Sequence, residues 1–251
     1  MFGSFGSRAW EFRLLGFPVR VDMSFWFLAV LLGLGSQDVR QILIWVSVVF
    51  VSILAHELGH AAMGRRFGLQ GSIELYSMGG LTRWVTSRSL THGQDITIGL
   101  AGPLTGLAIG GTVWATVHLT GWPESFYHRV IVGDLLWVNI GWGLLNLLPI
   151  EPLDGGHVVA STIHWIRGYR DEALPLLVSV IFGGAAVATA LIFGMMWGAL
   201  LAGLFTFRNV TALRQYGQIR PRDKFAALMV FAAVAAGMIL LFSHLGWPGQ
   251  E

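Results

Sequence analysis

The sequence of 251 residues contains no cysteine, which excludes disulfide bonds and every zinc site built on thiolate ligands. Charged residues are also scarce, at 12% of the chain, whereas an ordinary soluble domain has about 25%. In their place the chain has 54% hydrophobic residues, 33 glycines and 11 tryptophans. This composition excludes a disordered chain and a DNA-binding module, disfavours a soluble enzyme, and indicates a protein that crosses a membrane several times.

Hydropathy predicts seven membrane-crossing helices, because about 20 apolar residues are needed to cross a bilayer. They lie near residues 20–36, 41–63, 95–119, 128–150, 173–191, 193–207 and 225–245. The fifth and sixth come from one apolar run that is too long for a single span, and we divide it near Phe193 and Gly194. The expected fold class is therefore an all-α polytopic membrane protein without a soluble domain.

The placement of the basic residues predicts how the chain is oriented. With seven crossings, every Lys and Arg except Arg40 and Arg129 falls on one side of the membrane. Short loops rich in Lys and Arg stay in the cytoplasm. We therefore expect a cytoplasmic N-terminus and a C-terminus outside. The net charge of only +2 gives no indication of a nucleic-acid partner.

Two segments have patterns that do not fit a crossing helix. Residues 1–22 partly alternate between apolar and polar around Gly16 and Pro18, which predicts a short N-terminal hairpin at the membrane interface. The segment Gly68–Thr82 is too short and too rich in glycine to cross. It is predicted to be a re-entrant or surface β loop, whose backbone must be shielded by protein or face water.

The most specific motif is His56-Glu57-Leu58-Gly59-His60, in the cytoplasmic half of the second predicted span. Positions i and i+4 of a helix share a face, so both imidazoles can bind one metal ion, and Glu57 can reach a metal-bound water. A charged group at the bilayer centre costs about 2.5–3.5 kcal/mol and usually faces a cavity or a partner. A divalent metal would be such a partner. The alternative is a helix end whose histidines form hydrogen bonds with neighbouring helices.

A catalytic zinc ion usually has three protein ligands, so two histidines leave one position to fill. Asp154 lies at the cytoplasmic end of the fourth predicted span, which the orientation places on the same side as His60. Glu151 is the rival ligand, three residues earlier. Asp154 could instead cap a helix that starts at Gly155.

This combination of motifs resembles the site-2 protease family of intramembrane zinc metalloproteases. The resemblance covers about residues 8–165 and is carried by His56-Glu-Leu-Gly-His60, Leu153-Asp154-Gly155-Gly156, Ala101-Gly102-Pro103-Leu104 and the segment Arg13–Phe25. It implies a single membrane-embedded metalloprotease domain over residues 1–251. That domain would have a catalytic core at 8–165, extra C-terminal spans at 173–245, and no PDZ or CBS domain.

The resemblance also implies what the site residues do. His56, His60 and Asp154 would bind one zinc ion, and Glu57 would be the catalytic base. The expected substrates are single-pass membrane proteins, cleaved within or near their transmembrane helices in the lipid bilayer. Gly71–Leu81 would be a membrane-associated β loop near the substrate path.

For Asn146 the resemblance suggests an amide that positions the substrate carbonyl or stabilises an oxyanion, and an interhelical hydrogen bond is the alternative. The predicted location is a prokaryotic cell membrane, with the active site toward the cytoplasmic face. No oligomeric state is predicted.

Two other classes of function compete with a protease. A transporter or channel would also place ionisable residues at membrane depth, and it would use Asp134 and Asp95 rather than the His-Glu pair. A proteolytically silent relative would bind membrane helices without cleaving them.

Overall fold

The computed structural model describes residues 9–36, 38–85, 88–170, 172–216 and 220–244, with side chains up to residue 232. Residue 8, where the predicted core starts, and residue 245, where the last predicted span ends, lie outside the described residues. The chain divides after Leu147 into two compact units, which we describe one at a time.

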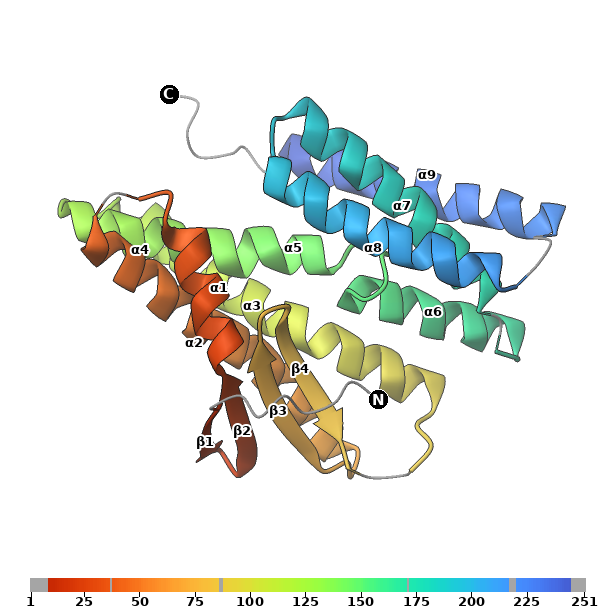
Figure 1. The fold of residues 1–251 in the computed structure, drawn as a ribbon, viewed down its shortest axis with the longest axis horizontal. Coiled ribbons are helices and arrows are strands. Elements are labelled where there is room, and N and C mark those ends of the chain that lie inside the picture. The colour runs from red at the N-terminus through yellow and green to blue at the C-terminus, as the bar shows by residue number, and fades with distance from the viewer. Residues whose placement is uncertain (1–8, 37, 86–87, 171, 217–219, 245–251) are drawn as a thin grey trace. The chain divides into compact units, whose positions relative to one another are not determined.

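The first unit contains a four-stranded sheet in the order β1-β2-β3-β4 (Figure 1). Its strands are β1 (Ala9–Leu14), β2 (Phe17–Asp22), β3 (Gly71–Tyr76) and β4 (Gly79–Trp84). Strands β1 and β2 form an antiparallel hairpin, as do β3 and β4, while β2 and β3 are parallel with Val19 opposite Ile73. The first hairpin turns at Leu15 and Gly16, both with positive φ, and glycine adopts such angles without steric cost.

The β structure of both predicted segments is thus confirmed in the described residues, whereas their placement at or within the membrane stays a prediction, and the all-α class needs correction. The chain is mostly helical with a small mixed sheet. The hairpins are far apart in the sequence, and each is predictable from its own residues. Their parallel pairing through β2 and β3 is a long-range contact that no local pattern encodes.

One face of this sheet forms part of a hydrophobic core. Val19, Val21, Ile73 and Leu75 alternate along β2 and β3, and each is at most 2% exposed. They pack with Phe25 and other apolar side chains of the neighbouring helices. The period of two along each strand therefore directs these residues inward and the charged residues of the same strands outward.

The helices of the first unit start at recognisable caps. Helix α1 is Met23–Gly33, α2 is Val39–Arg66 and α3 is His92–Thr120. The carboxylates of Asp22 and Asp38 accept hydrogen bonds from backbone N–H groups at the starts of α1 and α2, and Thr91 forms a capping box with Gln94 at the start of α3.

The fourth predicted span is a helical stretch with a change of register. It consists of α4 (Phe126–Leu136), a π-helical segment η1 (Trp137–Trp142) and α5 (Gly143–Asn146). The helix ends at Asn146 rather than at the predicted residue 150. Pro149 follows closely, and a proline disfavours helical conformation in the residue before it.

The second unit is helical in its described part. It contains α6 (Asp154–Arg167), α7 (Ala173–Ile192), α8 (Met196–Arg214) and α9 (Pro221–His244). The predicted division of the long apolar run is confirmed, because α7 ends at Ile192 and Gly194 has a φ of 69° before α8. Helix α6 is shorter than a span and was expected only in the alternative in which Asp154 caps a helix that starts at Gly155.

An ion-pair cluster joins the end of α6 to the start of α9. Arg167 Nη2 lies 2.7 Å from Asp223 Oδ1, and Arg220 Nε lies 2.9 Å from Asp223 Oδ2. The Asp223 side chain is only 2% exposed. Burial raises the pKa of this carboxyl, but the hydrogen bonds from Arg167 and Arg220 outweigh that effect and leave the pKa below its usual value.

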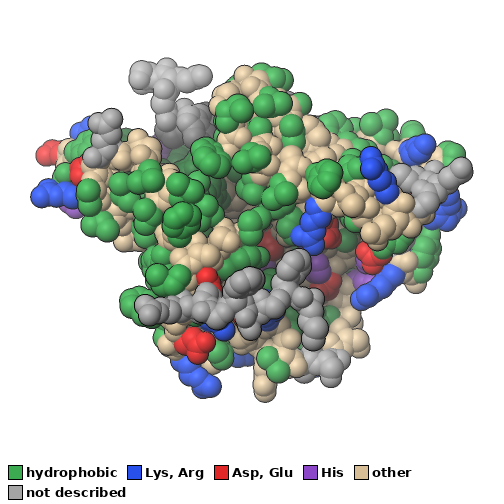
Figure 2. All heavy atoms as spheres, viewed as in Figure 1, with side chains coloured by type: hydrophobic (Ala, Val, Ile, Leu, Met, Phe, Trp, Pro, Cys, Tyr) green, Lys and Arg blue, Asp and Glu red, His purple; other side chains and the backbone are tan. Residues whose placement is uncertain are grey.

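Among the described residues, three helices are long and apolar enough to cross a membrane: α2, α3 and α7. Hydrophobic side chains are spread widely over the face shown in Figure 2, as expected for helices that contact lipid. The other four predicted crossings remain predictions. Helix α1 has only 11 residues, which is about half the length that a bilayer requires.

Candidate metal centre

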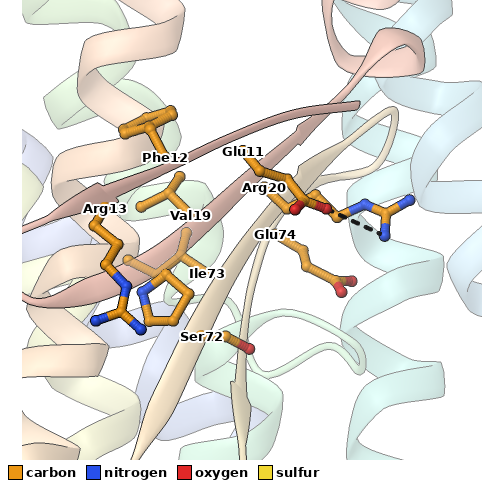
Figure 3. Close-up of a pocket in the computed structure, with 9 residues that line it drawn as sticks. Glu11, Phe12, Arg13, Val19, Arg20, Ser72, Ile73 and Glu74 are labelled. Carbon is orange, nitrogen blue, oxygen red and sulfur yellow. Dashed lines mark ion pairs between the residues drawn. The ribbon is translucent and has the colours of Figure 1, made fainter. Parts of the chain in front are cut away.

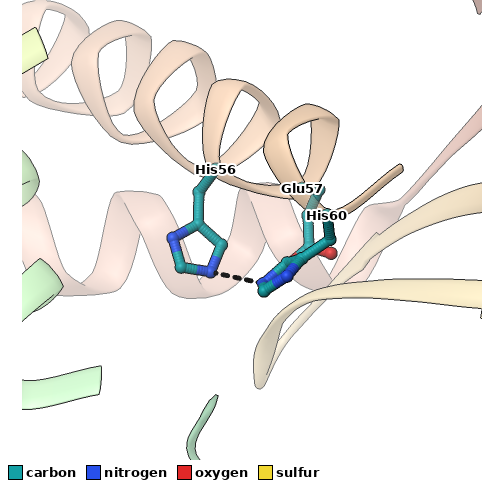
Figure 4. A group of neighbouring side chains, drawn as sticks. All are labelled: His56, Glu57 and His60. Carbon is teal, nitrogen blue, oxygen red and sulfur yellow. Dashed lines mark hydrogen bonds between the residues drawn. The ribbon is translucent and has the colours of Figure 1, made fainter. Parts of the chain in front are cut away.

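Helix α2 brings the two histidines of the motif together, as their spacing predicts. His56 Nε2 lies 3.1 Å from His60 Nε2, and both rings project from the same side of the helix (Figure 4). One donor atom from each of His56, Glu57 and His60 lies within 4.8 Å of the others. These residues could therefore hold one metal ion.

The orientation of His60 is set from helix α3. Its Nδ1 lies 2.7 Å from the carbonyl oxygen of Ile98, which can only accept a hydrogen bond, so Nδ1 carries the proton. The lone pair is then on Nε2, the atom that faces His56. A hydrogen bond of this kind, from the second ring nitrogen to a carbonyl, is the usual support of a metal-binding histidine.

The distance between the two Nε2 atoms fits zinc. Two nitrogen ligands of a tetrahedral zinc ion, with Zn–N bonds of about 2.0–2.1 Å, lie about 3.3–3.4 Å apart. The observed 3.1 Å is close to this value, and the shared face of α2 supplies both atoms. The donor set of two imidazoles with an adjacent carboxylate is also typical of zinc sites. His56, Glu57 and His60 could thus form a site for one zinc ion.

Two glycines allow α3 to approach the imidazoles closely. A Cβ at Gly102 would collide with His60 Nε2 and would lie 2.7 Å from His56 Nε2. A Cβ at Gly59 would lie 2.6 Å from the carbonyl oxygen of Ala101 and would collide with Thr105 Oγ1. The space next to the two Nε2 atoms therefore exists because position 102 has no side chain.

Glu57 is buried, with 5% of its surface exposed, and it faces strand β4. Thr82 Oγ1 donates a hydrogen bond of 2.7 Å to Glu57 Oε2. A Cβ at Gly80 would collide with the same carboxylate, so the β4 backbone passes directly over it. The sheet and α2 together hold the predicted base beside the predicted metal ligands.

Asn146 lies at the end of α5, and its side chain reaches the same site. Its Nδ2 lies 3.3 Å from His56 Nε2. The Asn146 amide therefore lies beside the nitrogen of His56 that would bind a metal.

Two polar side chains near the motif were not predicted from the sequence. Asn139 in η1 is 2% exposed and donates to Ser52 Oγ on α2 at 2.9 Å, one turn before His56. Asn139 Oδ1 has no hydrogen-bond partner among the described residues. Thr82 is the second. Asn139 and Ser52 could have been noticed in the sequence, because each is a polar residue inside an apolar span. The role of Thr82 could not, because it depends on how β4 packs against α2.

The remaining predicted ligands belong to the second unit. Asp154 is the first residue of α6, in its first helical turn, after Leu153. In the alternative reading, Asp154 would cap a helix that starts at Gly155. The helix instead starts at Asp154, and Leu153 is the residue at its cap position. The backbone N–H of Glu151 donates to Ser179 Oγ at 3.1 Å, and its carbonyl accepts from Asn209 Nδ2 at 2.8 Å. Whether Asp154 or Glu151 completes the metal site stays a prediction.

A shallow depression of about 420 Å³ lies over the sheet, with lining residues from β1, β2 and β3 (Figure 3). Glu11 and Arg20 form an ion pair of 3.8 Å across it. None of the residues lining the depression is a predicted ligand or catalytic residue. We assign the chemistry to the histidine pair and not to this depression.

Comparisons with known proteins agree with the geometry. The sequence model of "Peptidase family M50" matches residues 126–187. A Synechocystis protein named "Putative zinc metalloprotease" is 28% identical over 233 residues, covering 82% of this chain and 60% of that protein. A zinc metalloprotease of Methanocaldococcus jannaschii is 25% identical over 195 residues. The match covers 74% of this chain and 53% of the Methanocaldococcus protein. The chain thus spans little more than half of these relatives.

The fold has a counterpart among solved structures. The site-2 protease from Methanocaldococcus jannaschii superimposes with a TM-score of 0.50 at 21% sequence identity, covering 85% of this chain and 97% of that one. Together with the three apolar helices, these relatives indicate an integral membrane protein of the kind found in prokaryotes. The resemblance inferred from the motifs is confirmed: the chain is similar in sequence to peptidase family M50 and to zinc metalloproteases, and it shares its fold with a site-2 protease.

Proposed function

We propose that this chain is an intramembrane zinc metalloprotease that hydrolyses peptide bonds within or near the transmembrane helices of single-pass membrane proteins. The observation that carries this proposal is the 3.1 Å pair of imidazole Nε2 atoms beside the buried Glu57, on a helix apolar enough to cross a membrane. Placing two imidazoles and a carboxylate within a membrane-crossing helix costs free energy. We therefore infer that these residues are present for catalysis and not for stability.

We further propose that Asp154 is the third ligand of the zinc ion. A carboxylate from outside α2 would complete the three protein ligands that catalytic zinc sites usually have. Asp154 follows a stretch with Pro149 and Pro152, and Gly155 and Gly156 come directly after it. Small residues at this point allow another element to approach closely. Glu151 remains the competing ligand.

The identity of the third ligand is testable by metal analysis of the purified full chain. Asp154→Ala should lower the zinc content to less than half of the wild-type value, while Glu151→Ala should leave it unchanged. Expressing both variants at wild-type levels in the membrane controls for folding. The reverse pattern, with zinc lost only in Glu151→Ala, would assign the ligand role to Glu151.

The residues of the site have distinct tasks in the proposed hydrolysis. When bound, zinc polarises the scissile carbonyl and lowers the pKa of water toward neutrality. Glu57 accepts the proton of the attacking water and later donates it to the leaving amine. Asn146 is placed to donate its amide N–H to the substrate carbonyl oxygen, since its Nδ2 lies 3.3 Å from His56 Nε2.

A helical substrate must unwind before its peptide bonds can react, because a helix shields its own amides. Strand β4 is an edge strand of the sheet, and its backbone at Gly80 lies directly over Glu57. An unwound substrate segment could add to its outer edge through backbone hydrogen bonds. Strand β3 cannot take this role, since β2 and β4 pair with it on both sides.

The variant Glu57→Gln tests the proposed function against its competitors. The probe is an epitope-tagged single-pass membrane protein that the wild type cleaves after co-reconstitution in liposomes. Glu57→Gln should keep its zinc and lose at least about 100-fold in cleavage rate, the usual contribution of a general base. A wild type without cleavage of any single-pass protein would favour a silent helix-binding relative. Ion or solute flux that survives Glu57→Gln and requires Asp134 would favour a transporter.

A further inference from the structure

Strand β4 contacts helix α2 through three alternate residues. Gly80, Thr82 and Trp84 lie on one face of the strand because side chains alternate along a β-strand. The Trp84 ring occupies a notch at Gly64, where a Cβ would collide with it, and lies 2.8 Å from the Cβ position of Gly71. At the other end, the backbone of Gly80 covers the Glu57 carboxylate.

Thr82 lies between these two contacts, and its hydroxyl is directed at the base. Its Oγ1 is 2.7 Å from Glu57 Oε2 and 3.2 Å from the backbone carbonyl oxygen of Glu57. A hydroxyl has one proton to donate, and the contact with the carboxylate oxygen is the shorter of the two and has the usual length of an O–H···O hydrogen bond. The Thr82 proton is therefore donated to the side chain of Glu57.

We propose that Thr82 is a positioning residue for Glu57, which holds the carboxylate in the orientation required for proton transfer. The inference rests on the proposed proteolytic function. A carboxylate held by a fixed donor does not need to rotate into place when the proton is transferred, and small errors in the position of a reacting group are costly in rate.

The structure places the Thr82 hydroxyl on a rigid support. Thr82 is in register with Ile73 of β3, which is fully buried and in turn opposes Val19 of β2. The Trp84 ring in its notch fixes the strand along α2. Because the sheet fixes the position of Thr82, the hydroxyl in turn fixes the position of the Glu57 carboxylate on α2.

The hydroxyl contacts the Glu57 carboxylate, whose proposed task is proton transfer, whereas the nitrogens of His56 and His60 would bind zinc. Removing the hydroxyl should therefore change catalysis without changing metal content. Valine has nearly the shape of threonine and lacks the hydroxyl, while serine keeps the hydroxyl and lacks the methyl group. These two substitutions separate the hydrogen bond from the packing of the strand.

The kinetic test uses the purified full chain in liposomes with the same tagged single-pass substrate. Thr82→Val should lower kcat roughly 10-fold, with KM and zinc content within about 2-fold of wild type. Thr82→Ser should recover kcat to within about 2-fold of wild type. Thr112→Val is the matched control, because the Thr112 hydroxyl donates to Ala108 O within its own helix, and it should leave kcat unchanged. A Thr82→Val chain with wild-type kcat, or a Thr82→Ser chain as slow as Thr82→Val, overturns the proposal.

A second readout needs neither zinc nor substrate. In the metal-free chain, Thr82→Val should lower the melting temperature by about 2 °C, and by less than half as much when Glu57→Ala is already present. Equal losses in both backgrounds would show that Thr82 acts through strand packing and would overturn the proposal. If the wild type cleaves no substrate, the proteolytic function fails, and the positioning role of Thr82 in that reaction fails with it. The comparison of melting temperatures with and without Glu57→Ala still shows whether the hydrogen bond exists.

Discussion

Gly102 determines how much room the two imidazoles have for a metal ion. An added methyl group at this position would collide with His60 Nε2 and lie within 2.7 Å of His56 Nε2. We therefore expect Gly102→Ala to weaken zinc binding at least 10-fold, because the methyl group displaces the nitrogen ligands or occupies the position of the ion. Zinc per chain after dialysis against a graded chelator series measures this loss.

A neighbouring glycine on the same helix provides the control. Nothing lies within 4 Å of the Cβ position of Gly111 in α3. Gly111→Ala should keep its zinc and should be as stable as wild type or slightly more so, since alanine favours helix over glycine. Wild-type zinc affinity in Gly102→Ala would show that the imidazoles bind the metal in a different arrangement from the one observed.

At the scale of elements, α7 and α8 pack closely at one glycine. A Cβ at Gly183 would collide with Thr206 Oγ1, whose hydroxyl donates to Ala202 O at 2.7 Å. Gly183→Ala should lower the free energy of unfolding by about 1–2 kcal/mol, because overpacking forces the helices apart or displaces the hydroxyl. In thermal unfolding this corresponds to a decrease of roughly 2–8 °C.

The adjacent residue separates packing from helix propensity. The Cβ position of Gly184 has no neighbour within 4 Å. Gly184→Ala should leave the melting temperature unchanged or raise it. If both variants melt alike, the α7–α8 contact at Gly183 contributes nothing to stability.

The ion-pair cluster between α6 and α9 predicts a dependence of stability on pH. The pKa of Asp223 is lowered in the folded chain, so its ionised form contributes stability at neutral pH. That contribution is complete above the unfolded pKa of about 3.9 and is lost as the pH falls through the lower folded pKa. Asp223→Asn should melt about 5 °C below wild type at pH 7, and the difference should shrink below pH 4.

Arg222 offers a comparison for this cluster. Its Nε lies 4.0 Å from Asp223 Oδ1, and its side chain is 67% exposed. Exposed pairs contribute little, so Arg222→Gln should change the melting temperature by less than 2 °C. A difference between Asp223→Asn and wild type that persists unchanged at pH 3 would contradict the assignment of the stability to the ionised carboxylate.

The elements that the sequence predicts best are those set by local patterns. The long apolar runs predicted α2, α3, α7 and the break at Gly194, and the spacing of His56 and His60 predicted their shared face. The parallel pairing of β2 with β3, the π-helical segment and the contact of Thr82 with Glu57 were not predicted. Each of these depends on residues far apart in the chain or on how one helix packs against another, and periodicity does not report such contacts.

At the scale of the whole molecule, the predicted orientation can be measured directly, because the chain has no cysteine to remove. Ser89 precedes α3 and Ser125 precedes α4, and both are exposed. With a cytoplasmic N-terminus, a membrane-impermeant maleimide should label Ser125→Cys in intact cells and Ser89→Cys only after permeabilisation. Labelling of Ser89→Cys in intact cells would reverse the proposed orientation.

The parallel pairing of β2 and β3 also constrains the path of the chain between them. Strands that exchange backbone hydrogen bonds must lie on one side of the hydrocarbon layer, and Asp22 ends β2 while Gly71 begins β3. If α2 crosses the membrane as predicted, the segment carrying α1 and α2 would have to leave that side and return to it. During synthesis, the N-terminal hairpin would have to wait for this excursion to finish before it gains its partner strands. With two such crossings, the complete sheet would form only after the histidine-bearing helix has crossed the membrane.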